Sequence, residues 1–280
     1  MTGRLKTGLP NFGNTCYINA VLQCLRYSKP LVYMLREHRV VAKPNDKKDQ
    51  LLESFVELLF ADCAAKDLHV FIRNLAYLQR QFSLLRQCDS HELYLYIIDT
   101  FFEKYPKKFV NPYKGSLEST VTCLSCSHES ITCFPFISLS LEMETSQTPQ
   151  KVSDLLLNFQ KDEFLEDMID CDKCCIKRRS KKKLCVKELP KLLVIHLKRF
   201  NGMHKNNSPI FIDKFIQVNG KKFRLFGLCN HSGTMNGGHY TATCRRRDSM
   251  WAVCNDNIIE KIADLPQSTP VAYILFFEAI

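Results

Sequence analysis

The sequence lacks the features that mark membrane proteins, secreted proteins and repeat proteins. Its 280 residues contain no apolar run of 18 or more, so we expect no transmembrane helix. The N-terminal stretch has basic residues but not the apolar core of a secretory signal. No internal repeat or low-complexity segment is present. With 45% hydrophobic residues, the chain is expected to be globular and intracellular, in the cytoplasm, the nucleus or both.

Two kinds of residue are abundant, namely cysteine and the cationic residues. Fourteen cysteines without a signal peptide favour reduced thiols that bind metal or act in catalysis over disulfides. The net charge of +10 could favour nucleic acid or acidic partners. Much of it lies in one run, KRRSKKK, from Lys177 to Lys183. This run predicts a solvated loop or hairpin edge, and a nuclear-import signal is the alternative.

The spacing of apolar residues divides the chain into an α-rich part and a β-rich part. Helices are expected over 16–38, with a break at Pro30, over 50–62 and over 89–105. Strands are expected over 116–141 and from 184 onward, with a helical interlude over 152–169. This order predicts an α+β fold, in which one catalytic unit carries an inserted, metal-stabilised β piece.

Two C-x-x-C pairs, Cys123 with Cys126 and Cys171 with Cys174, have the spacing of metal ligands. Each such turn lets two thiolates converge, and two turns complete the four-thiolate shell that Zn²⁺ prefers. We therefore predict one zinc ion that joins the ends of the insert. Its role is structural, because four thiolates leave no open coordination position. Four unrelated free cysteines are the alternative. Because Cys175 directly follows Cys174, the spacing alone leaves open which of the two is the ligand.

Cys16 is the candidate nucleophile, because it follows a glycine turn and opens a predicted helix in the stretch GNTCYINAVLQCL. Unpaired backbone N–H groups and the macrodipole at a helix N-terminus stabilise a thiolate. The side-chain amide of Asn11 could donate to a developing oxyanion, together with the Cys16 N–H. Many cysteines at helix starts are inert, so this segment alone leaves the role open. Cys24, further along the same helix, is expected to be packed.

Among eight histidines, His239 is the best candidate for the base. It follows Gly237 and Gly238, where the missing side chains would let a substrate backbone approach closely. It also opens a strand-like run, HYTATC. The other histidines considered are His91 on a helix, His128 beside a cysteine pair, His196 in an apolar run and His231 in a turn-rich loop.

A hairpin register supplies a partner for His239. If HYTATC and MWAVCN form a hairpin centred on Arg247, Asn255 lies opposite His239 on the same side of the sheet. An asparagine beside the imidazole would hold its orientation and tautomer. A shift of one residue would bring Asp256 there instead. An ordinary polar cross-strand pair is the other interpretation.

Together these motifs resemble the ubiquitin-specific protease family, the papain-like deubiquitinases. GLPNFGNTCYINAVLQCL resembles the Cys box of that family, and NGGHYTATCRRRDSMWAVCNDNII resembles its His box. QCDSHEL resembles the second box, LPKLLVIHLKRF a strand motif and AYILFF the last strand. The resemblance runs from about Gly8 to Phe277. In the second box, Cys88 and Leu93 depart from the usual glutamine and phenylalanine, and neither touches the proposed chemistry.

The resemblance implies a papain-like fold with a thumb (about 1–105), zinc-bearing fingers (106–188) and a palm (189–280). It assigns Cys16 as nucleophile and His239 as general base. The residues that would assist them are Asn255, which orients the imidazole, Asn11, in the oxyanion hole, and Asp89, which holds the backbone of the ubiquitin tail. The alternative for Asp89 is a helix cap, and both roles are compatible.

The implied activity is hydrolysis of the isopeptide or peptide bond after the C-terminal glycine of ubiquitin, through a thioester on Cys16. Gly237 and Gly238 would line a narrow channel for the two glycines that end ubiquitin. The implied partners are ubiquitin and ubiquitinated proteins, with no membrane and no nucleic acid. The alternatives are a hydrolase for another ubiquitin-like modifier, a ubiquitin-binding module without turnover, and a basic zinc protein that binds nucleic acid.

Overall fold

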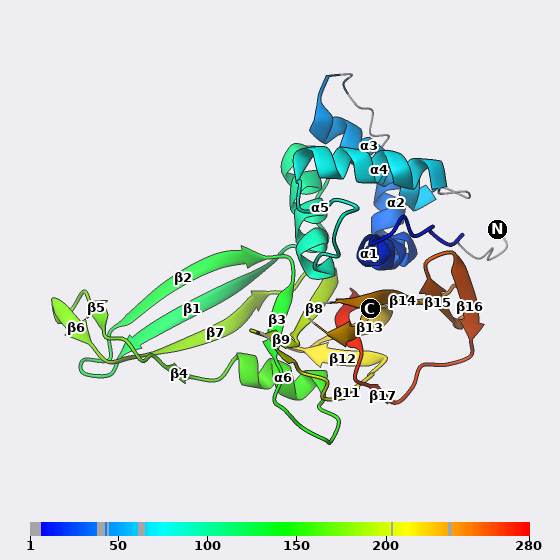
Figure 1. The fold of residues 1–280 in the computed structure, drawn as a ribbon. Coiled ribbons are helices and arrows are strands. Elements are labelled where there is room, and N and C mark those ends of the chain that lie inside the picture. Colours follow the sequence, from blue (N-terminus) through cyan, green and yellow to red (C-terminus); the bar gives the residue numbers. More distant parts are fainter. Residues whose placement is uncertain (1–6, 38–42, 44, 61–64, 203, 235–236) are drawn as a thin grey trace.

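The chain folds as a helical part packed on a large β-sheet, with a long, narrow second sheet that projects to one side (Figure 1). The structure, a computed structural model, describes residues 7–37, 43, 45–60, 65–202, 204–234 and 237–280. The predicted α+β class is confirmed. No helix among the described residues is long and apolar enough to cross a membrane.

The helical part consists of α1 (Cys16–Tyr27), α2 (Lys29–Glu37), α3 (Lys47–Phe60), α4 (Ala65–Leu78) and α5 (Ser90–Lys104). The expected break near Pro30 is confirmed, and this proline lies in the first turn of α2, where its missing N–H has no helical partner to lose. Asp89 caps α5 by accepting a hydrogen bond from the His91 N–H at 2.7 Å. The helix α1 is buried from Cys16 to Arg26, because it lies between the other helices and the sheet.

The large sheet has the strand order β16-β15-β14-β13-β18-β8-β3, and β12 pairs with β13 outside this path. Its strands are β3 (Leu139–Glu142), β8 (Leu192–Lys198), β12 (Phe215–Val218), β13 (Lys221–Thr234), β14 (Gly237–Arg245), β15 (Trp251–Asn255), β16 (Ile258–Ile262) and β18 (Ala272–Ala279). Only the pairing of β3 with β8 is parallel among these described strands. Short pairs join β9 (Phe200–Asn201) to β10 (His204–Lys205) and β11 (Ile210–Phe211) to β17 (Ser268–Thr269).

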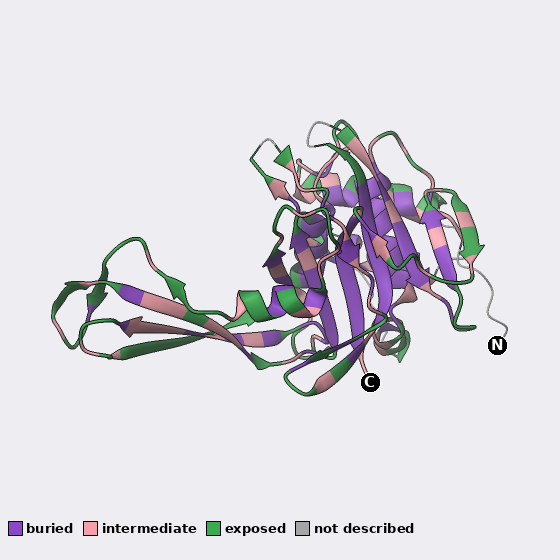
Figure 2. Cartoon of the chain, turned by 90° about the horizontal axis from the view of Figure 1, so that it is seen from below, coloured by how far each residue is buried: buried purple, intermediate pink, exposed green. Residues whose placement is uncertain are grey.

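The central strands of the large sheet, β8 and β18 above all, are buried on both faces, as the purple strands of Figure 2 show. One face packs on the helices, and the other packs on α6 (Val152–Phe159) and the base of the projecting sheet. Neighbouring residues of β8 and β18 therefore point into two different cores. This explains why LLVI and ILFF are continuous apolar runs rather than alternating ones.

The projecting sheet has the order β2-β1-β7-β4, and a hairpin of β5 and β6 lies at its far end (Figure 1). Its strands are β1 (Gly115–Cys123), β2 (Glu129–Phe136), β4 (Glu163–Phe164), β5 (Ile169–Cys171), β6 (Ile176–Arg178) and β7 (Ser180–Glu188). Much of this sheet is exposed in Figure 2, and in β2 only Phe136 is buried. Such a thin layer has little core of its own.

The structure corrects the expected helical interlude over 152–169. The helix α6 ends at Phe159, and residues 163–164 and 169–171 are strands held by pairing with β7 and β6. Residues 139–159 pack with the large sheet instead of the projecting one. The strands of the projecting sheet and its end hairpin therefore lie within 115–136 and 163–188.

The hairpin of β14 and β15 forms as expected, but its register is not the one predicted. Ala242 lies opposite Cys254, and Arg245 lies opposite Trp251, so the turn is centred on Asp248. His239 and Asn255 are therefore not directly opposite each other. The predicted register is wrong by two residues. A shift of two leaves the side chains of His239 and Asn255 on the same face of the sheet.

Candidate active site

The start of α1 is held in place by the segment just before it. Cys16 is the first residue of the helix and is 3% exposed. The side-chain oxygen of Asn11 accepts hydrogen bonds from the backbone N–H of Thr15 at 3.1 Å and from its hydroxyl at 3.2 Å. Earlier in this segment, Gly8 packs against the turn that follows β15. No side chain fits at Gly8, because a Cβ would lie 2.2 Å from the Asn257 carbonyl oxygen.

The amide of Asn11 has a defined orientation. Its nitrogen donates to one carboxylate oxygen of Asp256 at 2.9 Å, and the other carboxylate oxygen accepts from the Asn19 amide at 2.7 Å. Because the Asn11 oxygen accepts two bonds from Thr15, the positions of its N and O are fixed. One amide hydrogen of Asn11 remains available. The backbone N–H of Cys16, in the first turn of α1, also has no partner within the helix.

The ring of His239 contacts the side chain of Asn255. Its Nε2 lies 2.7 Å from the side-chain oxygen of Asn255. Since that oxygen can only accept, this contact needs a proton on Nε2, which leaves Nδ1 for a second partner. Asp256, the alternative partner in the sequence, has a left-handed backbone (φ 49°) and is bonded to Asn11 and Asn19 instead.

Gln87 joins the nucleophile to the strand that carries the histidine, and sequence reasoning assigned it no role. Its amide nitrogen donates to the Cys16 Sγ at 3.0 Å and to the Gly238 carbonyl oxygen at 2.7 Å. Its side-chain oxygen accepts from the Gly238 N–H at 3.1 Å. No direct hydrogen bond joins Cys16 to His239 among the described residues. The only sequence signal was the position of Gln87 in the second box.

Both carboxylate oxygens of Asp89 accept a hydrogen bond. One accepts from the His91 N–H, and the other accepts from the Tyr273 hydroxyl at 2.7 Å. The helix-cap interpretation of Asp89 is therefore confirmed. Its contact with β18 also fixes the start of α5 against the large sheet, close to the strands that carry His239 and Asn255.

The two glycines before His239 have different surroundings. A Cβ on Gly238 would lie 2.3 Å from the His231 Nε2 and 2.4 Å from the Ser232 carbonyl oxygen. A Cβ on Gly237 would meet nothing within 4 Å. Of these two glycines, only Gly238 lies where packing excludes a side chain.

Three of the other histidines, two buried and one half-buried, have lowered pKa values. The rings of His91 and His196 stack with their centroids 3.9 Å apart, and each contacts a serine hydroxyl at 2.9 Å. Burial lowers the pKa of His91 to about 4 and that of His196 to about 3. Burial, assisted by Lys205 and His239, lowers the pKa of His231 to about 4. Such residues stabilise the core and are poor bases near pH 7.

Several buried cysteines are inert for a similar reason. Burial raises the pKa of Cys24, and it raises the pKa of Cys229 to about 12. Both thiols stay protonated near pH 7, and a protonated thiol is a poor nucleophile. The expectation that Cys24 is packed is confirmed, since it is fully buried.

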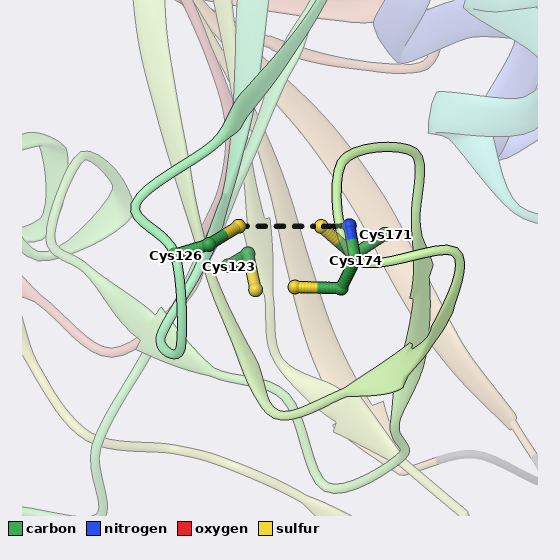
Figure 3. A group of neighbouring side chains, drawn as sticks. All are labelled: Cys123, Cys126, Cys171 and Cys174. Atoms are coloured by element: carbon green, nitrogen blue, oxygen red, sulfur yellow. Dashed lines mark hydrogen bonds between the residues drawn. The ribbon is translucent and has the colours of Figure 1, made fainter.

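Four cysteine side chains converge where the hairpin of β5 and β6, here called the tip hairpin, meets β1. Figure 3 shows them pointing toward one another. The sulfur atoms of Cys123, Cys126, Cys171 and Cys174 all lie within 4.8 Å of one another. Four thiolates about 2.3 Å from one Zn²⁺ ion would be about 3.8 Å apart. The Cys126 and Cys171 sulfurs are 3.6 Å apart, so this cluster could hold a metal ion.

The two C-x-x-C turns have the same backbone form. The Ser127 N–H donates to the Cys123 carbonyl at 2.9 Å, and the Cys175 N–H donates to the Cys171 carbonyl at 2.8 Å. Ser127 and Cys175 both have left-handed backbones, with φ of 56° and 58°. Cys175 is thus the residue that closes the second turn, and it lies outside the cluster of sulfurs.

The basic run is paired with an acidic segment that precedes it. Lys177 lies opposite Asp170 in the tip hairpin, and Lys182 lies opposite Glu163. The Lys181 ammonium is 2.5 Å from a carboxylate oxygen of Asp162. Most of the run lies in β6, which forms a hairpin with β5, and in β7, which pairs with β1 on one side and β4 on the other.

Known proteins and a family model are similar to nearly the whole of this chain. The family model described as "Ubiquitin carboxyl-terminal hydrolase" matches residues 7–277. Ubiquitin carboxyl-terminal hydrolase 21 of Rattus norvegicus is 28% identical over 99% of this chain and 62% of its own length. Ubiquitin carboxyl-terminal hydrolase 25 of Arabidopsis thaliana is 30% identical over 96% of this chain and 47% of its own. The chain therefore spans less than two thirds of these relatives.

The fold also matches solved structures. The SAGA Ubp8/Sgf11/Sus1/Sgf73 DUB module bound to ubiquitin aldehyde contains a chain with a TM-score of 0.83 and 24% identity. The match covers 98% of this chain and 69% of that chain. A yeast SAGA DUB module with an Sgf73 substitution gives the same TM-score and identity, over 100% of this chain and 71% of that one. This likeness concerns the fold.

Proposed function

Because this chain belongs to the ubiquitin carboxyl-terminal hydrolase family, we propose that it is a thiol-dependent deubiquitinase. It hydrolyses the isopeptide or peptide bond after the C-terminal glycine of ubiquitin. The observation that carries the proposal is the contact of His239, on β14, with Asn255, on β15, at 2.7 Å, together with Gln87, which connects β14 to Cys16. Ubiquitin and ubiquitinated proteins are the proposed partners, and the DUB module with a similar fold binds ubiquitin aldehyde.

The first half of the reaction forms a thioester. The Cys16 thiol gives its proton to Nδ1 of His239, and the resulting thiolate attacks the carbonyl carbon of the terminal glycine, whose oxygen becomes an oxyanion. The free amide hydrogen of Asn11 and the N–H of Cys16 stabilise this charge. The imidazolium of His239 then gives its proton to the leaving lysine amine as the C–N bond breaks. Asn255 accepts from Nε2 throughout and keeps Nδ1 available for the proton.

The second half regenerates the enzyme. His239 takes a proton from water as that water attacks the thioester carbonyl. The C–S bond then breaks, which releases ubiquitin with a free carboxylate and restores the Cys16 thiolate. Asp89, whose carboxylate accepts from Tyr273, is proposed to hold the backbone of the ubiquitin tail, and Gly237 and Gly238 are proposed to border its path. The proposed division is a thumb over about 1–105, fingers over 106–188 and a palm over 189–280.

The four-cysteine cluster is proposed to bind one zinc ion. Cys123, Cys126, Cys171 and Cys174 would hold it, and its contribution when bound is structural. It would fasten the tip hairpin to the end of β1, in a sheet that buries few side chains. We also propose an intracellular location, which is supported by the need for free thiolates at two separate sites.

A ubiquitin probe with a C-terminal electrophile tests the proposal directly. Folded, zinc-loaded protein should form a covalent adduct, and mass spectrometry should locate it at Cys16. Cys16→Ala should form none, whereas Cys133→Ser should react normally, because Cys133 is an exposed thiol on the projecting sheet. Probes built on other ubiquitin-like modifiers should react more slowly. If zinc-loaded, folded protein forms no adduct, the proposed deubiquitinase activity is refuted.

A further inference from the structure

Gln87 occupies a position that links the two halves of the site. It lies just before α5, and the two atoms that it joins belong to α1 and β14. Its amide nitrogen uses both hydrogens, one on the Cys16 sulfur at 3.0 Å and one on the Gly238 carbonyl at 2.7 Å. Its oxygen accepts the Gly238 N–H at 3.1 Å. In the described part of the chain, no other side chain hydrogen-bonds to both the sulfur and β14.

We propose that Gln87 is a further catalytic residue, which stabilises the thiolate form of Cys16 and fixes the backbone from which His239 projects. This inference rests on the proposed function. It assigns a specific task to a residue of the second box other than Asp89. The task has two parts, electrostatic and positional, and each part has its own structural basis.

The electrostatic part follows from the direction of the hydrogen bond. The amide N–H of Gln87 can only donate, so its contact with Cys16 is strongest when the sulfur is a thiolate. Hydrogen bonds to a charged acceptor are roughly twice as strong as those between neutral groups. Little water reaches this sulfur, because Cys16 is 3% exposed. The amide therefore takes the place of solvent in stabilising the anion.

The positional part follows from the surroundings of Gly238. On one side, His231 and Ser232 approach so closely that no Cβ fits. On the other side, the amide of Gln87 satisfies both the N–H and the C=O of this glycine. Gly238 is therefore held from both sides. His239 is the next residue, so its ring begins from a fixed point relative to Cys16.

The two parts predict opposite rankings for two substitutions. Gln87→Met keeps the length of the side chain but removes both the donor and the acceptor. Gln87→Glu keeps the shape and the acceptor for the Gly238 N–H, and it brings a negative charge to the sulfur. If the donor stabilises the thiolate, Gln87→Glu is the more damaging change. If Gln87 only positions Gly238, Gln87→Met is the more damaging one.

The test measures the alkylation of Cys16 by iodoacetamide between pH 5 and 10, with mass spectrometry of the Cys16 peptide. This readout needs no ubiquitin. We expect the pH of half-maximal reactivity to rise by about one unit in Gln87→Met and by more in Gln87→Glu, because the thiolate loses a charge-assisted hydrogen bond. Near pH 7 the rate should fall about tenfold, whereas well above the midpoint it should equal or exceed that of the wild type.

The matched control is Gln81→Met, which lies in the segment before α5 and donates to Glu92 on the surface. Its alkylation profile should coincide with that of the wild type. Coincident midpoints in wild type, Gln87→Met and Gln87→Glu would overturn the inference, and so would a larger shift in Gln87→Met. Turnover of a fluorogenic ubiquitin substrate is measured in parallel. A wild type with no turnover would refute the proposed function, while the alkylation midpoints would still decide the role of Gln87.

Discussion

The side-chain amide of Asn11 is hydrogen-bonded to the carboxylate of Asp256 at 2.9 Å. This contact turns the amide so that one N–H remains for the proposed oxyanion. We expect Asn11→Ala to lower kcat about 10²- to 10³-fold, as the loss of one oxyanion donor does elsewhere. Asp256→Ala should lower kcat by a smaller factor, because the Asn11 amide is still present but free to turn. Steady-state kinetics on a fluorogenic ubiquitin substrate measures both.

The control for this pair is Asp264→Ala. Asp264 is another carboxylate in the C-terminal part, and it pairs with Lys214 on the surface at 2.6 Å. Its loss should leave kcat and KM unchanged. A kcat for Asp256→Ala equal to that of the wild type would contradict the positioning role.

The contact between His239 and Asn255 leads to a second prediction. Asn255→Ala should reduce kcat by about 10²-fold with little change in KM, because the imidazole loses its orientation but the tail path stays intact. Asn255→Asp should retain more activity, since a carboxylate oxygen can accept the same bond. If KM rises while kcat stays constant, Asn255 has a binding role instead.

A third prediction distinguishes two adjacent cysteines. Cys174→Ser should abolish stoichiometric zinc binding and lower the melting temperature, because three thiolates bind the ion more weakly. Cys175→Ser should retain one zinc ion per chain, since its sulfur lies outside the cluster. Elemental analysis by mass spectrometry and thermal unfolding measure these effects. Equal zinc content in the two variants would rule out the proposed ligand set.

A fourth prediction concerns acid stability. Burial holds the folded-state pKa of His91 at about 4, below the value near 6.5 of an unfolded histidine. The unfolded state therefore binds more protons between these values, and the free energy of unfolding falls as the pH drops from about 6.5 to 4. One such histidine contributes at most about 1.4 kcal/mol per pH unit.

Urea unfolding at several pH values measures this slope. His91→Gln should reduce the slope by the amount that corresponds to the uptake of about one proton. The glutamine amide should still reach the Ser138 hydroxyl. Loss of zinc in acid affects the wild type and the variant equally, so it cancels in the difference. Identical slopes would show that His91 takes up its proton in the folded state as readily as in the unfolded one.

A fifth prediction concerns the two glycines before His239. Gly238→Ala should destabilise the fold by about 1–3 kcal/mol through overpacking against His231, and it should lower kcat by displacing His239. Gly237→Ala should leave stability unchanged, because its Cβ would lie in open space. If the ubiquitin tail passes at this point, Gly237→Ala should raise KM. An unchanged KM would exclude Gly237 from the tail path.

The features that could be predicted from the sequence have local signals. Cys16 follows a glycine turn, Asp89 precedes a helix, and the paired cysteines lie at ligand spacing. The contact of His239 with Asn255 was predicted from a register that is wrong by two residues. The prediction of this contact survived because side chains on a strand alternate with a period of two.

The features that could not be predicted depend on pairing between distant segments. The acidic segment 163–171 has helix-like spacing, but two basic strands pair with it and hold it extended. Such tertiary contacts override local preference. Likewise, the role of Gln87 depends on Gly238, which is 151 positions away, and no pattern within either segment records that contact.

Asn11 and Asp256 are 245 residues apart in the chain, so a ribosome makes the parts of the candidate site at well-separated times. At roughly 5–20 residues per second, a ribosome needs roughly 10 to 50 s to make the second residue after the first. Until then the thiol of Cys16 has neither its base nor an oriented oxyanion donor. If the proposed function holds, a nascent chain is therefore inactive as a protease until β15 joins the sheet.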